Sequence, residues 1–176
     1  MICTFPRHPA NLPAATYAPL GARREGIKFP AGVSFTACGS NQFSLGLPVT
    51  GHQAVAGKLL SLAYLWNAVR VQGGAYGTGA QFSIDGDISL WSYRDPDPCR
   101  TLGCDKGAPE FLREFAKSDE SLDQIIVGTV AASESLITPK SATTLSNLRY
   151  LSGITYEDRC QRRKEMLSTT KQDLLP

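Results

Sequence analysis

A glycine-rich segment, Gly73 to Gly79, follows an arginine and contains a tyrosine, and this pair could do chemistry. Arg70 stands at the end of a predicted helix, and Tyr76, six residues later, stands at the start of a predicted strand. A guanidinium and a phenol both donate hydrogen bonds, so they could bind a peptide carbonyl and stabilise the oxyanion that forms when water attacks it. The structural alternative is that Arg70 complements the helix dipole and Tyr76 packs in the core. On spacing alone this structural alternative is favoured.

Glycine-rich segments also bind phosphates, but the order of elements is wrong for that here. Phosphate loops run from a strand into a helix, so that the amino end of the helix faces the anion. In this sequence a predicted helix runs into a predicted strand, and the lysine of the nucleotide triphosphate motif is missing. We therefore do not expect a nucleotide site.

Residues that could bind a metal are few and scattered. The chain has two histidines, His8 and His52, and five cysteines. His52 falls in the first turn of a predicted helix without a second histidine at ligand spacing, so an exposed polar role is favoured over a catalytic or ligand role. Cys99 and Cys104 are close in sequence but lack the partners of a tetrahedral site, and we interpret them as ordinary loop cysteines. The odd count, without a secretory signal, favours free thiols in a reducing compartment.

Length and composition predict one globular domain with an irregular lead-in. The chain has 176 residues, of which 42% are hydrophobic and 19% charged. Residues 1–28 are rich in proline and alanine and are predicted to form a linker or extended arm, and residues 29–176 to form the domain. The net charge of +2 is spread along the sequence, and no apolar run reaches the roughly 20 residues of a membrane-spanning helix. We expect neither a nucleic-acid nor a membrane partner, and no secretion signal.

The elements that must position Arg70 and Tyr76 are a long helix and a hairpin. Thr50 and Gln53 match a reciprocal helix cap, and the helix that they begin ends at Gly73. Its apolar residues recur at three- and four-residue steps, which predicts a buried central helix. They are Val55, Leu59, Leu62, Trp66 and Val69, with Leu60, Ala63 and Leu65 beside them.

Two stretches of strand character follow, residues 75–84 and 88–93, around the turn signal Asp85-Gly86-Asp87. A further short strand is predicted before the long helix, at residues 33–37. Residues 94–98 contain two prolines, which block both a helix and a strand ladder, and the stretch Ser92 to Pro96 is interpreted as a rigid connection that leaves the hairpin. The sequence therefore predicts a helix, a glycine break and then an antiparallel hairpin.

The remaining chain is predicted to be helical with interruptions. Helices are expected over residues 110–117 and 121–132, between Thr138 and Gly153, and from a cap at Thr155 to about Thr169. A fresh helix start at residues 170–173 is followed by the last residue, Pro176, so we expect the natural fold to continue beyond it and the chain to be truncated. The fold class is α+β, with a largely antiparallel sheet and helices packed mainly on one face.

Four segments of the sequence closely resemble, in order, the last domain of presequence proteases, a branch of the pitrilysin/insulinase family of zinc metallopeptidases. The resemblance extends over residues 25–170. The segments are residues 64–77 (YLWNAVRVQGGAYG), 92–96 (SYRDP), 137–140 (ITPK) and 149–159 (RYLSGITYEDR). The first segment is long enough to be specific.

The resemblance implies a pitrilysin-like fold and a role for Arg70 and Tyr76 in the active site, where they would bind substrate and assist the transition state. It also implies a catalytic zinc held by an inverted motif, His-x-x-Glu-His, in the first domain of the complete enzyme. Neither His8 nor His52 begins such a motif. We therefore expect no cofactor or metal to be bound by this chain, which alone would be inactive. Its expected partners are the N-terminal half of the same enzyme and a short or unfolded peptide substrate.

Two other functions remain open at this point. The chain could belong to a non-catalytic paralogue of the same superfamily that serves in structure or assembly, or it could be a free-standing module that binds peptides along an open sheet edge. The resemblance implies a cytoplasmic location in a bacterium, and the mitochondrial matrix or another organelle in a eukaryote.

Overall fold

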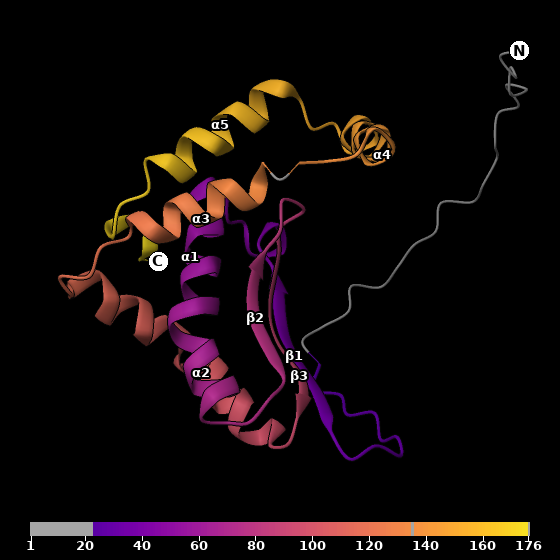
Figure 1. Cartoon of the computed structure of the whole chain (residues 1–176), viewed down its shortest axis with the longest axis vertical. Helices are drawn as coiled ribbons and strands as arrows, with labels where there is room; N and C mark the ends of the chain where they lie inside the picture. Colours follow the sequence, from indigo (N-terminus) through magenta and orange to yellow (C-terminus); the bar gives the residue numbers. More distant parts are fainter. Residues whose placement is uncertain (1–22, 135, 176) are drawn as a thin grey trace, which may run out of the picture. The chain divides into compact units, whose positions relative to one another are not determined.

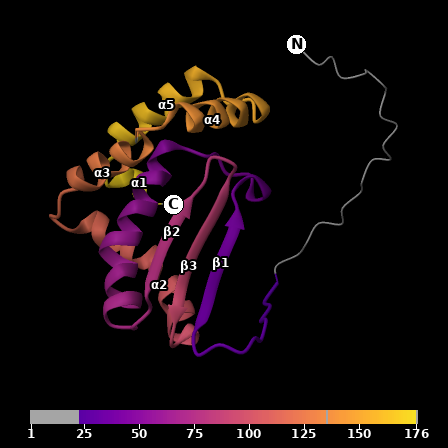
Figure 2. The same cartoon turned by 45° about the vertical axis from the view of Figure 1, so that its right-hand side comes forward.

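The computed structural model describes residues 23–134 and 136–175, and the described residues from Ala31 onward form one compact unit. The described residues contain a three-stranded sheet of β1 (Ser34–Asn41), β2 (Gly77–Phe82) and β3 (Asp87–Asp95). The strand order is β1-β3-β2, and both pairings are antiparallel. This sheet and the helices around it confirm the predicted α+β class, and Figures 1 and 2 show helices α1 and α2 across one face of the sheet.

The long predicted helix is present but changes its winding halfway. It begins as α1 (Gly51–Leu59) and continues as a π-helical segment, η2 (Leu60–Val71). The predicted cap is confirmed, because the amide of Thr50 donates a hydrogen bond to Oε1 of Gln53 at 2.9 Å. At the other end, the amide of Gln72 donates to the carbonyl oxygen of Asn67, a π-type bond across five residues.

The π winding explains why the predicted apolar stripe was partly wrong. Val55, Leu59 and Val69 are buried as predicted, but Leu62 is 49% exposed and Trp66 is 43% exposed. A widened helix no longer repeats at three- and four-residue steps, so its buried face passes through Leu60, Leu65 and Val69 instead. The described core forms two clusters. Helix α1 contributes to the first cluster, and η2 contributes to the second.

Helix α2 (Pro98–Lys117) is longer than the sequence predicted. The prediction placed its start at Glu110, after a region that contains Pro98, Pro109 and two glycines. Pro98 occupies the first turn, where a proline costs no hydrogen bond, and Asp97 caps it by accepting from the amide of Arg100 at 3.1 Å. Pro109 lies inside the helix and removes one bond to the carbonyl of Asp105.

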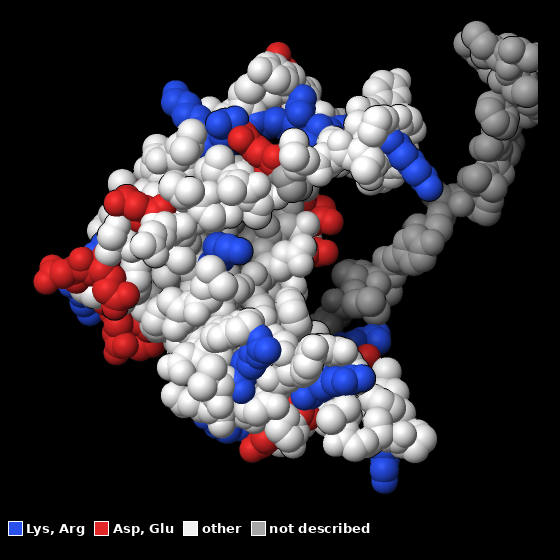
Figure 3. All heavy atoms as spheres, viewed as in Figure 1, with Lys and Arg blue, Asp and Glu red and all other residues white. Residues whose placement is uncertain are grey.

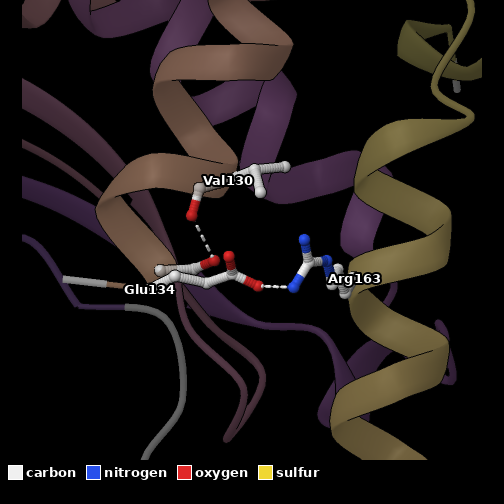
Figure 4. Close-up of polar contacts among 4 residues, drawn as sticks. Val130, Glu134 and Arg163 are labelled. Carbon is white, nitrogen blue, oxygen red and sulfur yellow. Dashed lines mark hydrogen bonds and ion pairs between the residues drawn. The ribbon is translucent and has the colours of Figure 1, made fainter. Parts of the chain in front are cut away.

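Three further helices follow, close to their predicted bounds: α3 (Asp123–Ser133), α4 (Pro139–Leu151) and α5 (Tyr156–Leu167). Helix α3 packs on α1, and Leu122 at the N-cap of α3 and Thr129 within it are buried. Helices α3 and α5 are joined by an ion pair, in which the Glu134 carboxylate at the end of α3 meets the guanidinium of Arg163 (Figure 4).

Two short 3₁₀ turns complete the described fold, η1 (Phe43–Leu45) and η3 (Gln172–Leu174). The predicted cap before η3 is present, since the amide of Thr170 donates to Oδ2 of Asp173 at 2.8 Å. Leu174 is buried in the same core cluster as α1. Residues 1–22 of the predicted linker lie outside the described residues. No helix among the residues described is long and apolar enough to cross a membrane.

Candidate functional site

Arg70 and Tyr76, the two predicted site residues, come together at one end of the sheet. The Cζ atom of Arg70 lies 6.0 Å from the centroid of the Tyr76 ring. Tyr76 is 63% exposed and Arg70 is half-buried, so a ligand at this end of the sheet could reach both side chains. The two residues therefore face a shared spot on the surface, and the alternative in which Tyr76 packs in the core does not hold.

The turn between the helix and β2 sets this geometry. The amide of Gly74 donates to the carbonyl of Arg70, and the amide of Ala75 donates to the carbonyl of Val69. Gly74 has a φ of 78°, in the left-handed region that glycine adopts without strain. The chain therefore reverses direction within a few residues of Arg70, and Tyr76 returns beside it.

Tyr76 is held in place by strand β3. Its amide is shared between the carbonyl oxygens of Tyr93, at 3.1 Å, and Arg94, at 3.3 Å. Its ring meets the Tyr93 ring edge-on, with 5.4 Å between centroids and 81° between planes. The Tyr93 ring in turn contacts Phe35 of β1 at 5.5 Å. Tyr76 thus stands at the end of a row of aromatic side chains on the sheet face that the helices leave uncovered.

Strand β3 carries a β-bulge at the point where it supports Tyr76. Ser34 of β1 pairs with Asp95 and Phe35 pairs with Tyr93, which leaves Arg94 without a partner in β1. Arg94 has a φ of 49°, and it is the one non-glycine residue with positive φ among those that the structure describes. Such a conformation costs about 1–3 kcal/mol in a residue with a side chain.

A buried polar network holds the bulge. The extra residue at the bulge turns Asp95 toward α2, where it is 1% exposed. Its Oδ2 accepts from the hydroxyls of Ser92 and Thr101, both at 2.6 Å, and its Oδ1 accepts from the amide of Asp97 at 2.9 Å. The Ser92 hydroxyl also bonds to Thr36 of β1. These bonds satisfy the buried carboxylate of Asp95 and fix the conformation of residues 92–97.

A second buried carboxylate lies close to this network. Asp105 on α2 is 7% exposed, and neither of its carboxylate oxygens has a hydrogen-bond partner in the described structure. Burial raises its pKa from 3.8 to about 6, and the negative charge of Asp95 adds to the effect. Asp105 therefore takes up a proton at mildly acidic pH.

The guanidinium groups of Arg70 and Arg94 are not neutralised by the part of the chain described. No carboxylate among residues 23–134 and 136–175 forms an ion pair with either, and neither guanidinium donates a hydrogen bond there. Figure 3 shows basic side chains along the upper edge, over α5, as well as at the lower end of the view, and acidic ones mainly at the left. This end of the sheet offers positive charge and donor groups to a ligand.

The other candidate residues do not form a site. Nδ1 of His52 lies 3.1 Å from Oγ1 of Thr169, so the half-buried His52 joins α1 to the C-terminal segment. Cys99 is exposed and Cys104 is half-buried, and neither forms a disulfide. No three His, Cys, Asp or Glu side chains within the described ranges are grouped so that they could hold a metal ion.

Sequence reasoning missed three residues around the predicted pair: Trp66, Arg94 and Asp95. Trp66 was assigned to the core because the π winding cannot be read from helical periodicity. The SYRDP segment was noticed but interpreted as a rigid connection, since a bulge leaves no signature in composition. An aromatic residue four positions before Arg70 was the available signal for a cation–π contact.

Comparisons with known proteins identify the family of the chain. Residues 24–175 match a family model described as the PreP C-terminal domain. The chain is 37% identical over 155 residues to presequence protease 1, chloroplastic/mitochondrial, of Arabidopsis thaliana, covering 88% of this chain and 14% of that protein. It is 34% identical over 149 residues to protein HypA of Clostridium perfringens, covering 85% of this chain and 15% of that protein. It is 30% identical over 149 residues to a mitochondrial presequence protease of Eremothecium gossypii, covering 84% of this chain and 15% of that protein. The chain thus spans a small part of the length of these relatives.

Proposed function

The chain belongs to the family of PreP C-terminal domains, and from this membership we propose that it is the substrate-binding part of a zinc-dependent metalloendopeptidase that degrades short or unfolded peptides. In this proposal Arg70 and Tyr76 complete an active site whose zinc lies in the N-terminal half of the same enzyme. The names of the plant and fungal relatives refer to chloroplasts or mitochondria, and for a eukaryotic source we propose an organellar location.

The observation that carries the proposal is the convergence of two free donors on an exposed spot. The Tyr76 hydroxyl makes no hydrogen bond within the described structure, and the Arg70 guanidinium has no anionic partner there. Donors that are preorganised and unoccupied can bind a peptide carbonyl and then stabilise the charge that develops on its oxygen. Arg70 and Tyr76 would thus bind the peptide bond from the side of this domain.

The residues that the structure describes do not fit a zinc site of their own. A catalytic zinc needs three protein ligands, and the described residues offer no such group, while the whole chain has two histidines. The proposal therefore assigns the metal to another part of the enzyme. The contribution of this chain is to bind and orient the peptide.

The proposal is tested in the complete enzyme with the variants Arg70→Ala and Tyr76→Phe. Each is expected to lower kcat by about a hundred- to a thousand-fold, the usual effect of removing one oxyanion donor. The zinc content, measured by elemental analysis, should stay at the wild-type level. Wild-type kinetics in both variants would contradict the assignment.

A different result would support the alternative, in which the chain belongs to a non-catalytic paralogue. If the coding sequence of the complete protein contains no inverted zinc motif, or the complete protein cleaves no peptide, this domain serves in structure or assembly.

A further inference from the structure

Arg94 stands beside the proposed catalytic pair and has no role in it so far. Its Cζ atom lies 5.9 Å from the centroid of the Tyr76 ring and 5.7 Å from that of Tyr93. Arg70 and Arg94 therefore approach the same tyrosine ring at nearly equal distances. The side chain of Arg94 is exposed, so a ligand bound at Tyr76 could also reach it.

We propose that Arg94 is a second substrate-binding residue, which binds a carboxylate group of the peptide while Arg70 and Tyr76 bind the peptide bond that is cut. This inference rests on the proposed function and extends it to the choice of substrate. The carboxylate has two sources in a peptide, the free C-terminus and an acidic side chain.

The backbone at Arg94 supports a role for its side chain. Glycine is the residue that adopts a positive φ without strain, yet this bulge holds an arginine there. The bulge also determines where the side chain goes: regular alternation after Tyr93 would point residue 94 toward the helices, whereas Arg94 contacts the rings of Tyr76 and Tyr93 instead. A strained residue that is aimed at a candidate site suggests a function in that site.

The chemistry of the group points to a carboxylate. A guanidinium that approaches an aromatic ring keeps N–H groups available for a ligand, and its planar fork matches the two oxygens of a carboxylate. Since no acceptor in the described structure uses these N–H groups, they are open to a ligand. Arg70 adds a second positive charge nearby, which raises the local concentration of anions.

The test uses the complete enzyme and four peptides of one sequence. Two peptides carry a glutamate near the cleaved bond, and two carry a glutamine at the same position. Within each pair, one peptide has a free C-terminus and the other an amidated C-terminus. The main variant is Arg94→Gly, because glycine keeps the left-handed backbone and the bulge while the guanidinium is removed. Arg100→Ala is the matched control, since Arg100 is an exposed arginine that bonds to Gln72 and is not placed over the Tyr76 ring.

The wild-type enzyme should prefer the peptides that carry the recognised carboxylate, and Arg94→Gly should lower kcat/KM for these peptides about tenfold or more. The fully neutral peptide should change by less than about twofold, on the scale of a lost uncharged contact. The comparison of the glutamate with the glutamine peptides, and of the free with the amidated C-termini, shows whether the bound carboxylate is a side chain or the C-terminus. Arg100→Ala should retain the wild-type preference.

An equal loss of kcat/KM for all four peptides, or no loss for any, would overturn the role of Arg94. Failure of the proposed function would look different, because Arg70→Ala and Tyr76→Phe would then leave turnover unchanged. Peptide Kd values measured by titration calorimetry test Arg94 independently of cleavage. Arg94→Gly should remove the dependence of Kd on the carboxylate, and a dependence that persists would contradict the inference.

Discussion

The guanidinium of Arg70 lies over the indole ring of Trp66, with 3.9 Å between Cζ and the ring centroid. The two residues are four positions apart in η2, on the side of the helix that is exposed. A cation at this distance from an indole is held by the ring's quadrupole, so Trp66 restricts where Arg70 can go. The finding makes Trp66 a positioning residue for the proposed site.

Replacing Trp66 should therefore change catalysis more than stability. In the complete enzyme Trp66→Ala is expected to lower kcat/KM about tenfold, because a cation–π contact contributes about 0.5–2 kcal/mol. Trp66→Phe should restore most of that loss, since it returns an aromatic face. Steady-state kinetics of each variant measure kcat/KM, and melting curves measure stability. Equal activity of the Ala and Phe variants would show that the ring does not position Arg70.

The pKa of Asp105 predicts a dependence of stability on pH. Because this pKa is raised from 3.8 to about 6 in the folded protein, the folded state binds the proton more tightly than the unfolded chain. The free energy of unfolding contributed by Asp105 should thus be greatest below pH 3.8 and should fall as pH rises toward about 6. Asp105→Asn should flatten this dependence and stabilise the protein above pH 6, by up to about 3 kcal/mol.

Urea unfolding curves of the wild-type and Asp105→Asn chains between pH 4 and pH 7, about one pH unit apart, provide the comparison. An unchanged slope of stability against pH in the variant would assign the titration to another group. Asp123→Asn is a suitable control, since this acid is exposed at the start of α3.

Two glycines should respond in opposite ways to the same substitution. A Cβ atom at Gly51 would come within 2.2 Å of the carbonyl oxygen of Arg162, where α1 meets α5. Gly51→Ala should therefore separate these helices and destabilise the fold by about 3 kcal/mol, the upper end of the usual cost of overpacking. A Cβ at Gly103 in α2 would meet no atom within 4 Å, so Gly103→Ala should stabilise the protein by about 0.5–1 kcal/mol. Thermal melts of both variants test this contrast.

The features that the sequence predicted well are those set by neighbouring residues. The caps at Thr50 and Thr155 and the Asp-Gly turn each depend on side chains within a few positions, and all three are present. Arg70 and Tyr76 belong to the same class, because the glycine turn between them determines their separation. Their catalytic role remains a prediction that rests on family membership.

The features that the sequence-based prediction missed depend on contacts between residues far apart in the chain. The first half of α2 forms although its proline and glycine content argues against a helix, since Thr101, Asp105 and Ala108 are buried against the rest of the domain. The π winding and the bulge at Arg94 likewise have no local signature. Both shift which side chains lie around Arg70 and Tyr76, so sequence periodicity misplaced Trp66 and overlooked Arg94.

The shared amide of Tyr76 has a mechanical consequence. Because it bonds to two successive carbonyls at the end of β3, the turn that carries Arg70 and Tyr76 cannot swing free of the sheet without breaking both bonds. If the complete protein opens and closes around a peptide, as the proposed function requires, its hinges lie outside this turn, which would move with the sheet as one rigid unit. Amide hydrogen exchange at Tyr76 should accordingly be as slow as in the middle of β3, with or without a peptide.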